Sequence, residues 1–200
     1  MNHLTSLNEI FANLSNVGTY KDWTKERTIK VVLGSSVIKV FVEKTKPILA
    51  EKLKEVDVNA ILNFQKQDEY DNWHDSETGK IYEALKSKAD NIARINSNEG
   101  LKYGHGTKIL NLFVGHLVFY SQYFTREEVE KVKYFLHVPL DSKVFKVLKK
   151  CHIENVPEWI KDVTRDVYKD IQEEIRDTAR KFNLPPLFFD EYAWALDKKG

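Results

Sequence analysis

The chain has 200 residues, 42% of them hydrophobic, which fits one compact domain or two small lobes that share a core. Its 31 basic and 30 acidic residues give a net charge of +1, which excludes a bulk attraction to nucleic acid or membrane, so a polyanion site would need local clustering. The single cysteine, Cys151, excludes an intramolecular disulfide framework and favours a reducing, intracellular setting, in the cytoplasm or nucleoid.

The first residues predict a helix, without the basic segment and apolar block of a signal peptide. Apolar residues at helical spacing fill positions 4–14, and the helix is expected to end at Gly18. The next segment, 28–46, is rich in β-branched residues and fits either a hairpin turning at 34–36 or a buried helix. We favour the helix because almost everything downstream has helical periodicity.

A short helix and a long connection follow. Pro47 is expected to open a helix that runs to about Val56. Residues 64–79 are polar and without an evident period, so they predict an irregular connection, and long connections are often functional or mobile.

The second half of the chain predicts a series of helices and hence an all-α fold. An amphipathic pattern covers 81–95, and the apolar run that ends at Tyr120 predicts a helix buried on all sides. Three further helices are marked by a capping box at Thr125–Glu128, by Asp141 in the N-cap position, and by Pro157 at the start of the longest amphipathic stripe. A final aromatic segment, 187–194, follows Pro185 and Pro186.

The central helix begins with a turn that contains two glycines, Gly104-His105-Gly106-Thr107. Lys108 follows in the expected first turn of the helix, where a cation opposes the macrodipole by about 0.3–1 kcal/mol. Sequences tolerate such misfits most often where function demands them. The apolar run is too short to cross a membrane, which takes about 20 apolar residues.

Two short motifs carry the functional interpretation: Gly104-His105-Gly106-Thr107-Lys108 and, further along, Val138-Pro139-Leu140-Asp141. In these motifs the chain resembles the helix-hairpin-helix DNA glycosylases, whose signature is a Gly-x-Gly hairpin, a lysine at the start of the next helix and a Val-Pro-x-Asp that caps a later helix. The spacing between the motifs, and the closing Pro186-Leu187, Asp190 and Trp194, look most like the archaeal 8-oxoguanine branch.

The resemblance covers 80–150 most strongly, and one motif departs from it. Leu101-Lys102-Tyr103 stands where the family has Leu-Pro before the first hairpin glycine. The resemblance implies one globular unit over 1–200, with a helix-hairpin-helix catalytic lobe at 80–151 and a second lobe made of 1–79 with 152–200.

The function that the resemblance implies is excision of a damaged purine, with 8-oxoguanine favoured, followed by strand cleavage. Lys108 would form a Schiff base with the sugar, and Asp141 would stabilise positive charge on it and help to deprotonate the lysine. A lysine attacks only as the free amine, which an apolar surround and a helix N-terminus both favour. The partner would be duplex DNA with a damaged base, the protein a monomer, and no metal, organic cofactor or membrane would be involved.

The remaining site residues follow from the chemistry of DNA. Glycines before the lysine let backbone groups approach a phosphate closely, so the turn made by Gly104, His105, Gly106 and Thr107 is a candidate for DNA-backbone contact. Basic side chains on the helix after Asp141 are further candidates. They are Lys143, Lys146 and Lys150. An extruded base needs an aromatic pocket, for which the candidates are Trp73, Trp159, Phe188, Phe189 and Trp194.

Structural interpretations stay open beside these. Asp141 fits a plain N-cap, Lys108 a surface lysine, and the glycines a turn. Two other functions also stay open: a helical nucleic-acid-binding or defence-associated protein without the chemistry, and a helical protein-interaction domain. The histidines at 105, 116, 137 and 152 lack the ligand spacing of a metal site.

Overall fold

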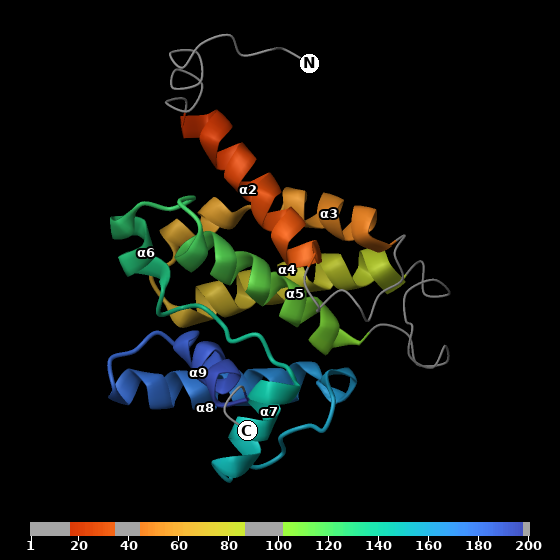
Figure 1. Cartoon of the computed structure of the whole chain (residues 1–200), viewed down its shortest axis with the longest axis vertical. Helices are drawn as coiled ribbons and strands as arrows, with labels where there is room; N and C mark the ends of the chain where they lie inside the picture. Colours follow the sequence, from red (N-terminus) through yellow and green to blue (C-terminus); the bar gives the residue numbers. More distant parts are fainter. Residues whose placement is uncertain (1–16, 35–44, 87–101, 198–200) are drawn as a thin grey trace.

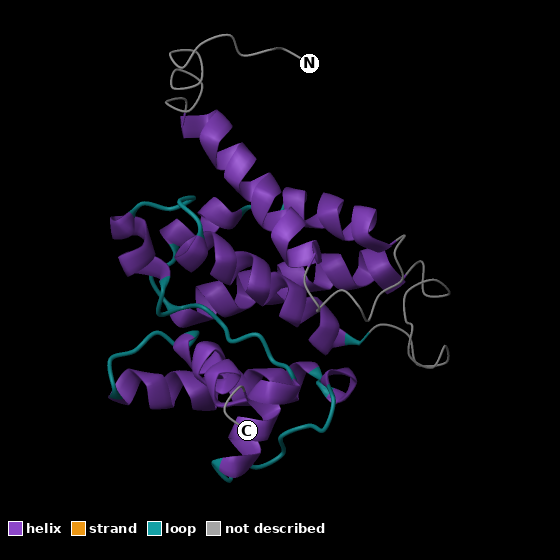
Figure 2. Cartoon of the chain, viewed as in Figure 1, coloured by secondary structure: helices purple, strands orange, loops and turns teal. Residues whose placement is uncertain are grey.

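A computed structural model describes residues 17–34, 45–86 and 102–197. Within these ranges every regular element is a helix, as Figure 2 shows, so the expected all-α fold is confirmed. The α-helices are α2 (Val17–Gly34), α3 (Thr45–Glu55), α4 (Gln67–Lys86), α5 (Tyr103–Gly115), α6 (Arg126–Val132), α7 (Ser142–Lys150), α8 (Arg165–Lys181) and α9 (Phe188–Asp197). Short 3-10 helices cover Val58–Asn63 (η2) and Ile160–Asp162 (η5), and a π-helical turn, His116–Tyr120 (η4), extends α5.

The helices form two lobes, each with its own hydrophobic core. In the first lobe, α2 to α6 pack around a core that runs from Ile29 to Leu136 and includes Leu187. In the second lobe, α7 to α9 surround a core from Val138 to Ala193. Figure 1 shows the first lobe above the second, with one connection crossing between them. The cores therefore divide the chain near residue 137, which differs from the expected grouping of 80–151 against 1–79 with 152–200.

Helix α5 runs through the first lobe, and near its N-terminus it also contacts η5 of the second lobe. Ten of its 13 residues are buried, which confirms the expected buried helix. A Cβ on Gly104 would lie 2.4 Å from the carbonyl oxygen of Ile160, and one on Gly115 would lie 3.0 Å from Leu187 Cδ2. Gly104 is thus required by close packing against a backbone carbonyl, whereas a side chain at Gly115 would press on the end of the Leu187 side chain.

Several local predictions are confirmed. Residues 28–34 are helical within α2, and Pro47 is the third residue of α3. Thr125 and Glu128 form the expected capping box of α6. The segment after Pro186 becomes α9. The rest of 28–46, the helix expected at 4–14, and most of the helix expected at 81–95 lie outside the described residues.

Three predictions are wrong. The expected irregular connection 64–79 is mostly the first part of α4. Its buried face carries His74, Glu77 and Thr78, and these polar residues conceal the helical period. Gly18 was expected to end a helix, but it lies in the first turn of α2. Pro157 does not open the long C-terminal helix, which begins at Arg165 with Thr164 as its N-cap.

Candidate active site

Lys108 of the first lobe and Asp141 of the second lie in contact, although they are 33 positions apart. The Lys108 Nζ atom is 3.4 Å from Asp141 Oδ2. The two side chains are 15% and 10% exposed, so the pair is mostly withdrawn from water but still open to it. We refer to Lys108 and Asp141 as the dyad.

Asp141 uses its two carboxylate oxygens for different purposes. Oδ1 accepts hydrogen bonds from the backbone amides of Lys143 and Val144, at 2.9 and 3.1 Å, and so caps α7 as predicted. Oδ2 faces the Lys108 amine. The cap fixes the orientation of the carboxylate, because both amides belong to the rigid first turn of α7.

Lys108 stands deeper in its helix than the sequence suggested. Because α5 begins at Tyr103, Lys108 is in the second turn and not in the first. The influence of a helix dipole is concentrated in the terminal turn, so the N-terminus of α5 has little influence on the Lys108 charge.

Asp190, on α9, is a third ionisable group at the dyad. Its pKa is raised to about 7, chiefly by burial and also by the negative charge of Asp141, while the Lys108 cation and a hydrogen bond with Trp194 act in the opposite direction. The Oδ1 atom of Asp190 is buried and has no hydrogen-bond partner among the described residues. An unsatisfied carboxyl oxygen beside an amine and a carboxylate can bind a polar group that enters the site. The C-terminal resemblance includes Asp190 but assigns it no role.

Trp194 and Lys143 lie beside each other next to the dyad. The Lys143 Nζ atom is 3.5 Å from the centre of the Trp194 ring, in a cation–π contact. Lys143 is only two positions from Asp141, and Trp194 lies one turn after Asp190. The three lysines expected to form one stripe on α7 therefore differ in exposure. Lys143 is half-buried, whereas Lys146 and Lys150 are exposed.

The other aromatic candidates are scattered. Phe188 opens α9, is 41% exposed and contacts Phe119. Trp73 packs against Phe64 and Tyr70 in the first lobe. Trp159 is exposed just before η5.

Phe189, also on α9, packs on the second core. Of the five candidates, Phe188, Phe189 and Trp194 share α9 with Asp190, so only they come from the helix that reaches the dyad.

The structure corrects the expected role of the residues before Lys108. Gly104, His105, Gly106 and Thr107 are buried in the first turns of α5 and do not form an exposed turn. Gly106 faces Thr78, and the His105 Nδ1 atom accepts a hydrogen bond from the Lys102 amide. These contacts are internal, so the segment packs helices together where we expected it to meet a phosphate.

Among the described residues, no group of three or more histidine, cysteine, aspartate or glutamate side chains is arranged to hold a metal ion. In the same ranges, no helix combines the length and apolarity needed to span a bilayer.

Comparisons with protein-family models, with curated proteins and with solved structures gave no match to this chain.

Proposed function

We propose that the protein is a DNA glycosylase with AP lyase activity that removes a damaged purine, with 8-oxoguanine as the first substrate to test. The observation that carries the proposal is the 3.4 Å approach of the Lys108 amine to the Asp141 carboxylate. Two groups from separate motifs of the chain meet and keep some exposure to solvent, and attack on a sugar carbon needs them both.

The chemistry assigns one role to each group. The Lys108 nitrogen attacks the anomeric carbon as the glycosidic bond to the base breaks, and the base leaves with that bond's electron pair and takes up a proton. Asp141 stabilises the positive charge that develops on the sugar. Opening of the sugar then gives a Schiff base on Lys108. Loss of a proton from the neighbouring sugar carbon expels the 3′ phosphate and cleaves the strand.

The surroundings of the dyad fit an extruded nucleotide. Asp190 offers a buried carboxyl oxygen that has no hydrogen-bond partner among the described residues, and Trp194, on the same helix, offers an aromatic ring that already carries the Lys143 amine over it. Removing a base from the duplex requires such stacking and polar contacts in place of those it leaves. Lys146 and Lys150 are exposed on α7 and are suited to bind the DNA backbone.

Borohydride trapping on a duplex that contains 8-oxoguanine tests the proposal. Reduction converts the Schiff base to a stable protein–DNA adduct, which is expected with the wild-type protein and absent in the Lys108→Gln variant. Lys149→Gln is the matched control, because Lys149 is also a lysine in an ion pair, with Glu158, but lies at the far end of α7. If the wild type forms no adduct with any purine lesion, or if Lys108→Gln still forms one, the proposal fails.

One observation favours a second candidate, a helical nucleic-acid-binding protein that lacks the chemistry. The residues from Gly104 to Thr107 are buried against the protein and leave no small-residue turn for a phosphate. This candidate predicts DNA binding that does not depend on a lesion and is unchanged by Asp141→Asn. Binding measured by fluorescence anisotropy on matched intact and damaged duplexes distinguishes the two.

A further inference from the structure

Asn111 lies one helical turn after Lys108 on α5 and is 2% exposed. Its Nδ2 donates to the carbonyl oxygen of Val138 at 3.0 Å and to the hydroxyl of Tyr168 at 2.8 Å. Its Oδ1 is 2.6 Å from His74 Nε2. A single amide thus connects the lysine-bearing helix with α4, with α8 and with the connection between the lobes.

Val138 is the other end of this link, and it opens the segment that leads to Asp141. Gln172 of α8 holds the same backbone from the opposite side: its Oε1 accepts from the Val138 amide at 2.8 Å, and its Nε2 donates to the Val138 oxygen at 2.7 Å. Asn111 and Gln172 together use both lone pairs of that oxygen. The position of Asp141, three residues later, is therefore fixed relative to α5.

The polarity of the surrounding hydrogen bonds leaves one consistent arrangement. His74 Nε2 donates to Asn111 Oδ1, and the Asn111 amide donates to the Tyr168 oxygen. The Tyr168 hydroxyl then donates to His137 Nδ1 at 3.1 Å. His137 Nε2 donates to Asp71 Oδ1 at 2.8 Å. In this arrangement both histidines are neutral, and each of these donors has a hydrogen-bond acceptor.

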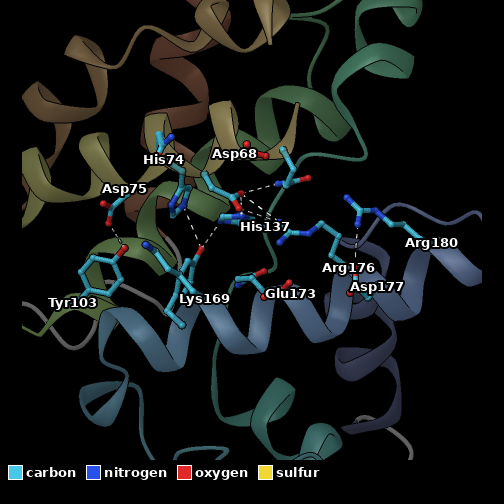
Figure 3. A pocket seen from close by; sticks show the side chains of 15 residues that line it. Asp68, His74, Asp75, Tyr103, His137, Lys169, Glu173, Arg176, Asp177 and Arg180 are labelled. Carbon is cyan, nitrogen blue, oxygen red and sulfur yellow. Dashed lines mark hydrogen bonds and ion pairs between the residues drawn. The ribbon is translucent and has the colours of Figure 1, made fainter. Parts of the chain in front are cut away.

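The chain of bonds ends at a cavity of about 480 Å³ between α4 and α8, which Figure 3 shows from close by. Asp71 on its wall also pairs with Arg176. The Asp71–His137–Tyr168 sequence resembles a relay that activates a nucleophile, but burial raises the pKa of Tyr168 well above its usual value. The hydroxyl also accepts a bond from Asn111. Tyr168 is hence a hydrogen-bond donor that orients its neighbours.

We propose that Asn111 is a positioning residue that sets the separation of the Lys108 amine and the Asp141 carboxylate. The inference rests on the proposed function and adds the device that fixes its geometry. A displacement of about 1 Å at a reacting group can reduce a rate about 100-fold. The dyad joins two lobes with separate cores, so its geometry depends on whatever ties those lobes together at Val138.

Single-turnover trapping by the intact protein tests the proposal with two variants, Asn111→Leu and Asn111→Asp. Both are expected to slow adduct formation about 10- to 100-fold while the DNA concentration at half-maximal rate stays within about twofold. Thr125→Ala is the matched control, because it removes the capping box of α6 at a distance from Val138. If the Asn111 variants lose no more activity than this control, the proposal is wrong.

The pH profile separates positioning from general loss of stability. A buried carboxyl group takes up a proton at a higher pH than usual and, once neutral, can again donate to Val138 or Tyr168. The ratio of wild-type to Asn111→Asp rate is therefore expected to fall as the pH is lowered, whereas the ratio for Asn111→Leu stays constant. Equal pH dependence of the two ratios would exclude the positioning role.

A second measurement needs no DNA. Reductive methylation by formaldehyde and a borane reagent modifies the neutral amine, and mass spectrometry reports its rate at Lys108. In Asn111→Leu this rate is expected to rise toward that of Asp141→Asn, because in both variants the amine loses its carboxylate. If the wild type never traps DNA but this shift occurs, the proposed function fails and the positioning role stands. If the wild type traps DNA and the methylation rate of Lys108 is unchanged in Asn111→Leu, the proposed function stands and the positioning role of Asn111 fails.

Discussion

Two polar clusters lie on the boundary between the lobes, and they differ in how completely their atoms are hydrogen-bonded. Around Asn111, both the amide nitrogen and the amide oxygen have partners, and the Tyr168 hydroxyl is bonded as well, at 2.6 to 3.3 Å. Around the dyad, the amine and the carboxylate stand 3.4 Å apart, and Asp190 has a buried oxygen without a partner among the described residues. A complete buried network fixes one structure, whereas unsatisfied groups are retained where a ligand can complete them. We call the residues around Asn111 (His74, His137 and Tyr168) the supporting cluster, and the dyad with Asp190 the reactive cluster.

The sharpest way to test this contrast is to neutralise the dyad. Asp141→Asn keeps an oxygen that caps α7 but removes the charge, so adduct formation is expected to fall about 100-fold or more. The melting temperature should change by about 2 °C or less. Asp141→Ala is expected to lose the same activity and, in addition, about 1 kcal/mol of stability with the cap. A fully active Asp141→Asn variant would remove the dyad from the mechanism.

Substitutions in the supporting cluster should mainly lower stability, whereas neutralising the dyad mainly lowers activity. Tyr168→Phe removes the acceptor for one Asn111 amide hydrogen and the donor to His137 Nδ1. Each group left unsatisfied is expected to lower the free energy of unfolding by about 1–3 kcal/mol. For a chain of this size each kcal/mol lowers the melting temperature by about 2–4 °C. Tyr134→Phe is the control, since the Tyr134 hydroxyl makes its 3.3 Å bond to Asn183 at the exposed surface. Equal melting temperatures for the two variants would show that the network carries little stability.

Acid should weaken the supporting cluster. Burial lowers the pKa of His74 and of His137, so the unfolded chain takes up protons near pH 6.5 before the folded chain does. The stability that the neutral histidines contribute is present above pH 6.5 and is lost as the pH falls, by about 1.4 kcal/mol per pH unit for each group. His74→Gln keeps a donor for Asn111 but does not titrate. Its urea-unfolding free energy is expected to fall less between pH 7 and pH 5 than that of the wild type.

Asp190 should show the reverse sign. Its pKa is raised to about 7, so the folded protein keeps a proton that the unfolded chain releases near pH 4. Wild-type stability from this group therefore declines as the pH rises from about 4 to 7. Asp190→Asn is expected to melt at a higher temperature than the wild type at pH 8, with a smaller gap at pH 5. A gap that is independent of pH would mean that Asp190 is not a buried titrating group.

The fold was predictable from the sequence wherever a local rule decided the outcome. Asp141 and Thr125 are caps because their side chains satisfy nearby amides, and the apolar run of α5 could only be buried. Helix α4 was missed because its buried face includes His74 and Glu77, which count as polar in any hydrophobic pattern. The buried polar residues of α4 are explained only by their hydrogen-bond partners in the folded structure, such as Asn111 for His74.

The site was predictable in part for a similar reason. The sequence singled out Lys108 and Asp141, and the structure brings them together; their catalytic roles stay predictions. Asn111 gave no signal within an apolar run, because its partners His74 and Tyr168 are 37 and 57 positions away. Long-range hydrogen bonds between single residues leave no period to detect. The burial of Gly104 depended likewise on η5, a segment far along the chain.

The divided use of Asp141 has a practical consequence. Since one oxygen serves the helix and the other serves the amine, replacing the acid by its amide should remove turnover while the scaffold persists. Such a variant would act as a recognition reagent that binds a lesion and remains there. Immobilised on a support, it could enrich damaged fragments from a mixture of duplexes, and what it retains would identify the natural target.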